Sequence, residues 1–216
     1  MTTPKVCGRI NTERVVKDMG QAATKIVEKE DGSKGLEVVM AGRTFTLPFK
    51  RIGGRMVGFL DISGQVSLIE SAADELTRRL LDAGVEFDTI LNPVSKSNAL
   101  AHAVALRWSK AKGEELSKTV VARKSSSPAK VSATYRSVTT PVDQTLSLTD
   151  GDVEYLRGKR LLVMDDVYGG GGTTEALKEL ARKAEADIAA FAVIAVEQGV
   201  TPPGNLYSLF ELPVLD

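Results

Sequence analysis

Residues 160–174 (RLLVMDDVYGGGGTT) constrain the fold of this chain more than any other segment. An apolar run ends in two neighbouring acids, Asp165 and Asp166, and four glycines and two threonines follow. The unbroken apolar character of residues 161–164 is typical of a strand covered on both faces, and residues 175–186 carry apolar side chains at helical spacing. The segment therefore predicts a strand, a glycine turn and a helix in direct succession.

The glycine turn is suited to binding an anion. It contains four residues without side chains, Gly169, Gly170, Gly171 and Gly172. Several backbone N–H groups can therefore converge on one ligand, and the start of the following helix adds the positive end of its dipole. Thr173 or Thr174 can cap that helix and offer a hydroxyl group to a phosphate oxygen. The alternative is a glycine-rich surface loop beside two solvated acids.

The two acids indicate which phosphate ligand the turn would take. Asp165 and Asp166 would repel a phosphate unless they had another partner, and ribose hydroxyl groups are suited to that role. No lysine follows the glycines, which excludes a nucleotide-triphosphate P-loop, and a dinucleotide fingerprint would place its acid about 20 residues later. The pattern fits a 5-phosphate in the turn, with the 2- and 3-hydroxyl groups of the same ribose on the acids.

Composition limits the remaining possibilities. The chain has 216 residues, with 28 Lys and Arg against 28 Asp and Glu, which predicts one moderately sized domain and no nucleic-acid partner. The single cysteine, Cys7, cannot form an internal disulfide, and no apolar signal segment precedes it. The longest apolar run, residues 188–196, is too short to cross a bilayer. We expect a cytoplasmic protein without a membrane segment.

The order of the predicted elements indicates an α/β fold. Residues 12–28 predict a helix and residues 36–49 a pair of strands, and together they suggest an N-terminal extension over residues 1–47. The rest, residues 48–216, reads as one α/β domain. It has predicted strands at residues 55–61, 87–94, 119–123, 161–164 and 188–197, and helices at residues 68–83, 99–111 and 175–186. This alternation predicts a doubly wound, mostly parallel sheet that binds ligands at the carboxyl ends of its strands.

The segment VMDDVYGGGGTT resembles the 5-phosphoribosyl-1-diphosphate (PRPP) motif of the type I phosphoribosyltransferases. The resemblance covers residues 87–213 well and residues 48–87 loosely, and it is nearest to the adenine and xanthine subgroup. It implies the fold of that family, with a hood formed by the N-terminal extension or by the C-terminal tail. Some family members carry an acid at the first loop position, where this chain has Gly169.

Three further segments fit this resemblance. Ser95, Lys96 and Ser97 form a polar turn between a predicted strand and helix and correspond to the diphosphate loop, although Val94 and Ser97 replace its usual acid and glycine. Arg123 and Lys124 end a predicted strand and match a basic pair that reaches PRPP. Residues 125–147 resemble a flexible catalytic hairpin, which would close over PRPP. The alternatives are an ordinary turn, solvated charges and a disordered linker.

The resemblance implies a Mg²⁺-dependent transfer of the phosphoribosyl group from PRPP to a free purine base, by a homodimer. Lys96, Arg123 and Lys124 would neutralise the departing diphosphate. PRPP itself would supply most of the ligands of the Mg²⁺ ion, and no metal ligand is assigned to the protein. Val167 and Tyr168 are the candidate base contacts. The alternatives are a non-catalytic PRPP-binding regulator of the purine-repressor type, or a transferase for orotate or another base.

Overall fold

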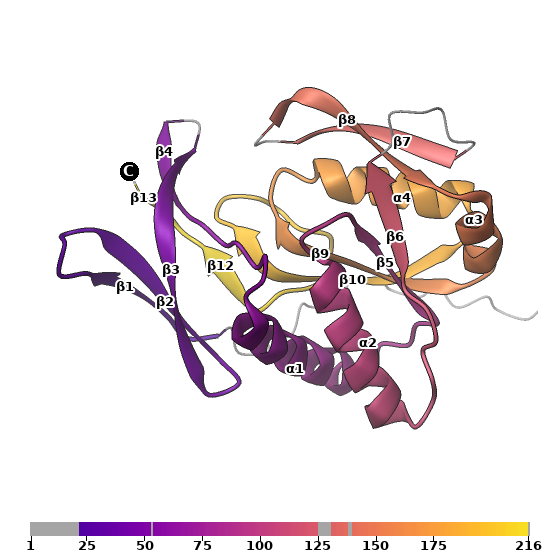
Figure 1. Ribbon diagram of the computed structural model, residues 1–216, viewed down its shortest axis with the longest axis horizontal. Helices are drawn as coiled ribbons and strands as arrows, with labels where there is room; N and C mark the ends of the chain where they lie inside the picture. The colour runs from indigo at the N-terminus through magenta and orange to yellow at the C-terminus, as the bar shows by residue number, and fades with distance from the viewer. Residues whose placement is uncertain (1–21, 53, 125–130, 138–139, 216) are drawn as a thin grey trace, which may run out of the picture.

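The computed structural model describes residues 22–52, 54–124, 131–137 and 140–215, which form two sheets (Figure 1). Within these residues the larger sheet has eight strands in the order β11-β10-β9-β5-β6-β8-β7, with β12 also beside β10. Its centre is parallel. The central strands are β10 (Asp187–Glu197), β9 (Arg160–Tyr168), β5 (Thr89–Pro93) and β6 (Val120–Lys124). The predicted α/β fold with a mostly parallel sheet is confirmed.

Both faces of the central sheet are covered, which explains the unbroken apolar runs in its strands. Figure 1 shows α1 (Val66–Asp82) and α2 (Asn98–Lys112) on one face and α4 (Gly172–Lys183) on the other. Alternate residues of β9 serve the two cores: Leu162 packs with the first pair of helices, and Val163 packs with α4. The predicted helices at residues 68–83, 99–111 and 175–186 are confirmed, with ends shifted by a few residues.

The segment after β6 turns back on the sheet as a hairpin. β8 (Thr140–Leu148) pairs antiparallel with β6, and β7 (Val131–Ser137) pairs antiparallel with β8. Figure 1 shows β7 and β8 above α4. A short helix that the sequence did not predict, α3 (Asp150–Leu156), follows, and the side chain of Thr149 caps it. The predicted hairpin is present in the described residues, while residues 125–130 and 138–139 lie outside them.

The second sheet is antiparallel and joins the two ends of the described chain. Its strands are β1 (Thr24–Glu28), β2 (Lys34–Met40), β3 (Arg43–Ile52), β4 (Arg55–Gly58) and β13 (Val214–Leu215). β3 runs through the boundary placed at residue 47, and β13 pairs with β4. The N-terminal hairpin and the C-terminal tail were alternative sources of a hood, and they contribute to the same sheet.

The predicted helix over residues 12–28 is wrong for residues 24–28. These residues form β1, which pairs with β2 so that Ile26 lies opposite Leu36. The reason is tertiary: β2 offers an open edge, and a run containing threonine, isoleucine and valine suits a strand once a partner is present. Residues 12–21 of the predicted helix lie outside the described residues.

The C-terminal tail holds the two sheets together. β11 (Leu206–Tyr207) and β12 (Phe210–Leu212) pair with β10 in the larger sheet, and the chain then crosses to β13 in the smaller one. The backbone N–H of Gly58 donates to the carbonyl oxygen of Pro213 at 2.9 Å, and the N–H of Val214 donates to Oε1 of Gln198 at 2.8 Å. The end of β10 is thereby tied to the smaller sheet. Of the helices in the described part of the chain, none has the length and apolar character needed to cross a membrane.

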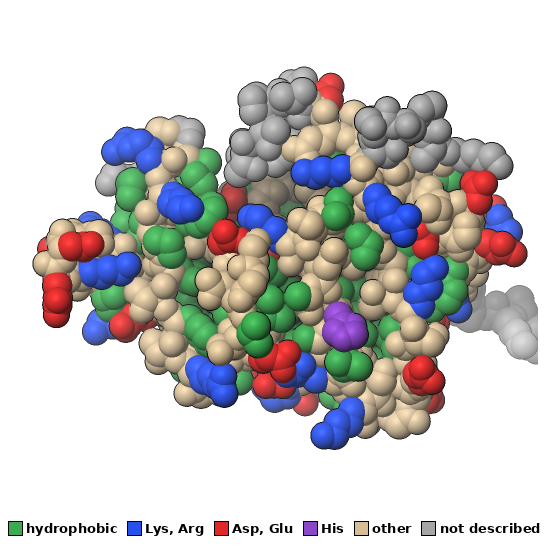
Figure 2. Space-filling view, in the orientation of Figure 1, with side chains coloured by type: hydrophobic (Ala, Val, Ile, Leu, Met, Phe, Trp, Pro, Cys, Tyr) green, Lys and Arg blue, Asp and Glu red, His purple; other side chains and the backbone are tan. Residues whose placement is uncertain are grey.

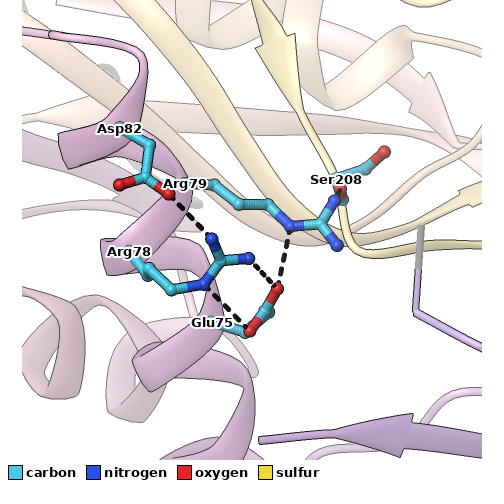
Figure 3. A network of polar contacts seen from close by, with 5 residues as sticks. All are labelled: Glu75, Arg78, Arg79, Asp82 and Ser208. Atoms are coloured by element: carbon cyan, nitrogen blue, oxygen red, sulfur yellow. Dashed lines mark hydrogen bonds and ion pairs between the residues drawn. The ribbon is translucent and has the colours of Figure 1, made fainter. Parts of the chain in front are cut away.

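A buried arginine also fixes the tail (Figure 3). Arg79 of α1 is 4% exposed, and its Nη1 donates to the carbonyl oxygen of Ser208 at 2.5 Å, while its Nε donates to Glu75 at 3.3 Å. The neighbouring Arg78 also pairs with Glu75, but its side chain is 55% exposed. The two arginines share a partner and differ mainly in burial.

We expect Arg79→Ala to lower the free energy of unfolding by about 2–3 kcal/mol, because it removes charged hydrogen bonds and leaves the Ser208 carbonyl without this donor. Urea unfolding followed by circular dichroism measures this change. Arg78→Ala is the matched control and should cost under about 1 kcal/mol, as exposed ion pairs do. Equal losses in the two variants would contradict the structural role assigned to Arg79.

Candidate functional site

A cavity of about 180 Å³ lies at the carboxyl ends of β9 and β10, facing the smaller sheet. Figure 2 shows acidic and basic side chains meeting in a hollow between the two sheets. One wall is mainly apolar and consists of Ile52, Val57, Gly58, Phe59, Leu60 and Leu212. The other wall belongs to the larger sheet and its turns, and it consists of Lys96, Asp165, Asp166, Val167, Gly169, Gly172, Thr173 and Glu197. The cavity therefore combines an apolar slot with a charged floor.

The floor of the cavity carries the two acids that end the buried part of β9. Oδ1 of Asp165 accepts from the N–H of Asp166 at 2.9 Å, and Oδ1 of Asp166 accepts from the N–H of Val167 at 3.0 Å. Burial, followed by the neighbouring charge of Asp166, raises the pKa of Asp165 well above its ordinary value. Ionised Asp165 would therefore gain from a ligand that donates hydrogen bonds, such as a pair of sugar hydroxyl groups.

Lys96 is the cation beside these acids. It lies in the turn between β5 and α2, and its Nζ is 3.8 Å from Oδ2 of Asp166 and 5.7 Å from the ring centroid of Phe59. The side chain is 45% exposed, so its ammonium group can move to a ligand. The turn also contains a cis peptide bond between Val94 and Ser95. The predicted site residues Lys96, Asp165 and Asp166 are thus brought together.

The two serines of this turn face differently. Ser97 is buried, and its Oγ donates to the carbonyl oxygen of Pro93 at 3.0 Å. The hydroxyl group of Ser97 also lowers the pKa of Asp165, against the larger effect of burial. Ser95 is exposed and does not line the cavity. The side chain of Ser97 therefore supports the floor of the site. A contact between Ser97 and a diphosphate would have to use its backbone N–H.

The glycine turn leads from β9 into α4 as predicted. Gly170 and Gly171 have positive φ angles of 39° and 78°, a region that favours glycine. Gly171 is the residue before the helix, so the N–H groups of Gly172 and Thr173 belong to the first turn, where a helix supplies no carbonyl partner. Tyr135 of β7 and Gly172 line a common hollow, which places the hairpin beside the turn. This arrangement suits an anion at the helix start.

Several other predicted residues do not line the cavity, among them Gly170 and Gly171 of the glycine turn. Arg123 and Lys124 are exposed at the end of β6, and neither lines it. Tyr168 turns toward the glycine loop, where its hydroxyl group donates to the carbonyl oxygen of Thr201 at 3.4 Å and lies near Gly171. Of the two candidate base contacts, only Val167 lines the cavity.

Seven residues that line the cavity were not predicted from the sequence, and Phe59 and Glu197 are the two of them that bring an aromatic ring and a charge. Phe59 lies in the connection after β4, and Nζ of Lys50 is 3.7 Å from its ring centroid. Glu197 ends β10, and its carboxylate approaches to 2.5 Å of the point where a Cβ atom on Gly169 would lie. Glu197 is the last residue of a strand that was predicted to be parallel, and ligands bind at that end of a parallel sheet. Its position in the sequence could therefore have identified it as a candidate site residue. No pattern in the sequence predicted that Phe59 would line the cavity.

The acids of the site fit a metal ion that the substrate helps to hold. In the ranges that the structure describes, no cluster of three or more histidine, cysteine, aspartate or glutamate side chains could hold a metal ion. Mg²⁺ is commonly bound by one or two carboxylates together with substrate phosphates and water. Asp165 and Asp166 can supply such carboxylates.

Solved structures similar to this chain include adenine phosphoribosyltransferases. The enzyme from Saccharomyces cerevisiae, complexed with adenine and an imino-altritol bisphosphate, has a TM-score of 0.55 and 19% identity over 87% of this chain and 94% of that one. The enzyme from Rhodothermus marinus has a TM-score of 0.54 and 18% identity over 88% and 94%. The enzyme from Trypanosoma brucei, in complex with AMP, pyrophosphate and ribose-5-phosphate, has a TM-score of 0.52 and 17% identity over 69% and 67%.

The chain has the fold of the adenine phosphoribosyltransferases. The resemblance read from residues 160–174 is thus confirmed for the phosphoribosyltransferase fold. No protein-family model matches the sequence, and the search of curated proteins found no match. At 17–19% identity the shared fold places the acids, the glycine turn and Lys96 at one edge of the sheet, and the chemistry has to be argued from these residues.

Proposed function

We propose that this protein is a phosphoribosyltransferase that transfers the phosphoribosyl group of PRPP to a free purine base and releases diphosphate. The observation that carries the proposal is the joint placement of Asp165 and Asp166, the glycine turn, and Lys96 around one cavity. The acids suit the 2- and 3-hydroxyl groups of a ribose, and the N–H groups at the start of α4 suit its 5-phosphate. In this proposal the ammonium group of Lys96, which lies beside Asp166, pairs with the diphosphate on C1.

The proposed reaction depends on charge that develops at C1. As the C1–O bond to diphosphate breaks and a nitrogen of the base attacks C1, positive charge grows on the ribose and negative charge on the leaving oxygens. Asp165 and Asp166 hold the ribose at a fixed place, and Lys96 neutralises the leaving group. Bound Mg²⁺ would add positive charge at the same oxygens. We therefore expect that positioning of the substrates by residues of this chain accounts for much of the rate acceleration.

The apolar wall is the proposed site of the base. Phe59 offers an aromatic face, while Val57, Leu212 and Val167 offer aliphatic contacts. The smaller sheet, together with the segment that follows β4, then acts as the hood, because these parts supply five of the six residues of this wall.

The remaining parts of the proposal concern groups outside the cavity. Arg123 and Lys124 would reach the diphosphate only across a dimer interface or after the hairpin closes, so their catalytic role, the homodimer and the lid stay predictions. Tyr168 could contact the base only if its side chain rotated away from Thr201 and toward the cavity. Dependence on Mg²⁺ and a cytoplasmic location are likewise predictions.

The test is a panel of free bases (adenine, hypoxanthine, guanine, xanthine and orotate), each mixed with PRPP and Mg²⁺ while diphosphate release is measured. We expect release with at least one purine and formation of the corresponding nucleoside monophosphate. Product from orotate alone would replace the purine assignment. PRPP binding without product from any base would favour a PRPP-binding regulator, and an absence of PRPP binding would refute the proposal.

A further inference from the structure

Glu197 occupies a position in the cavity that the reaction described above does not use. It is the last residue of β10, and β10 pairs with β12 so that Glu197 lies opposite Leu212 of the apolar wall. Its carboxylate fills the space beside Gly169, within 2.5 Å of where a Cβ atom would be. The absence of a side chain on Gly169 is therefore what lets this acid reach the cavity.

The carboxylate of Glu197 has no partner within the described part of the chain. No hydrogen bond or charge offsets its burial, and burial raises its pKa above the ordinary value. A half-buried acid without a donor is costly to ionise, and a ligand that supplies a donor would remove that cost. Glu197 lines the same cavity as Phe59 and Val167, where the proposed base would lie.

We propose that Glu197 selects the acceptor by accepting a hydrogen bond from an exocyclic amino group of the base. This inference rests on the proposed function. The other side chains around the slot are mostly apolar, so a single acceptor can distinguish two bases of nearly equal shape. An amino substituent donates to a carboxylate, whereas an oxo substituent presents a second acceptor. The acceptor class is therefore an amino-substituted purine.

The experiment measures kcat/KM for two pairs of bases that differ by one amino or oxo group, adenine with hypoxanthine and guanine with xanthine. We expect the protein to favour the amino member of at least one pair by about 10-fold or more. Glu197→Gln should reduce this ratio, since an amide can donate as well as accept, and Glu197→Lys should invert it, since an ammonium group only donates. PRPP binding by calorimetry should stay within about 2-fold in both variants.

Two further variants test the contact itself. Gly169→Ala should displace the carboxylate and lower the amino-to-oxo ratio. Added to Glu197→Ala, it should not change that ratio further, because the group that it displaces is then gone. These two variants test the contact even if Glu197→Lys does not fold. Glu211→Gln is the matched control: Glu211 is exposed in β12, outside the cavity, and the wild-type ratio should remain.

The outcomes separate the two proposals. Turnover of a base with an amino-to-oxo ratio that none of the Glu197 variants changes would overturn the role of Glu197 and leave the transferase standing. A wild-type preference for the oxo member of both pairs would also overturn it. If no base is consumed, the proposed function fails, and the role of Glu197 fails with it.

Discussion

Replacing Asp165 and Asp166 together with asparagine is expected to weaken PRPP binding by at least about 100-fold, because two charged hydrogen-bond acceptors for the ribose hydroxyl groups are lost. Titration calorimetry with PRPP and Mg²⁺ measures this directly. The variant should remain folded, because each carboxylate accepts only from the backbone N–H of the next residue and the ion pair of Asp166 with the half-exposed Lys96 is long, at 3.8 Å.

The single variant Asp165→Asn is expected to change how the stability of the protein depends on pH. The folded state raises the pKa of Asp165, first by burial and then through the charge of Asp166. Between the ordinary value, about 3.9, and the raised value, the folded protein holds a proton that the unfolded chain has released, so stability falls as the pH rises through this window. Asp165→Asn removes that fall. At pH 7 the Tm of this single variant should therefore equal or exceed that of the wild type.

The matched control for these acids is Asp187→Asn. Asp187 is exposed at the opposite end of the sheet, where β10 begins, and the same chemical change there should leave PRPP binding and the pH profile as they are. Unchanged PRPP affinity in the Asp165→Asn, Asp166→Asn double variant would refute the assignment of the ribose to these acids.

Gly171→Val is expected to remove measurable binding of the 5-phosphate. A valine side chain is strained at the φ of 78° that Gly171 adopts, and its Cβ atom would lie 3.2 Å from the hydroxyl oxygen of Tyr168. The turn would therefore have to change shape, and the N–H groups at the start of α4 would no longer converge on one point. Binding of ribose-5-phosphate, followed by calorimetry, is the readout.

The control for this change is Gly84→Val. Gly84 follows α1, has a φ of 63°, and has open space around its Cβ position. Both variants should lose about 1–2 kcal/mol of stability from backbone strain, but only Gly171→Val should lose the ligand. Ribose-5-phosphate binding that survives in Gly171→Val would show that the phosphate does not lie in the glycine turn.

The arrangement around β9 could be predicted because its signals are local. The apolar run, the two acids and the glycines are consecutive, and each of them restricts the backbone without help from distant residues. The rule that parallel sheets bind ligands at their carboxyl edge then brought Lys96 to Asp165 and Asp166, as the structure confirms. Arg123 and Lys124 end a neighbouring strand, yet the same rule did not bring them into the cavity, since it fixes an edge and not the direction of a side chain.

The amino-acid sequence by itself determined the strand, turn and helix of residues 160–183 and the alternation that makes the central sheet parallel. Only the tertiary structure decided that residues 24–28 form a strand, that Ser97 turns inward, and that Glu197 reaches past Gly169 into the cavity. It also decided that Val214 pairs with Val57, which closes the smaller sheet over the site. The physical reason is that these features depend on contacts between residues far apart in the chain, whose energies appear only when the partners meet.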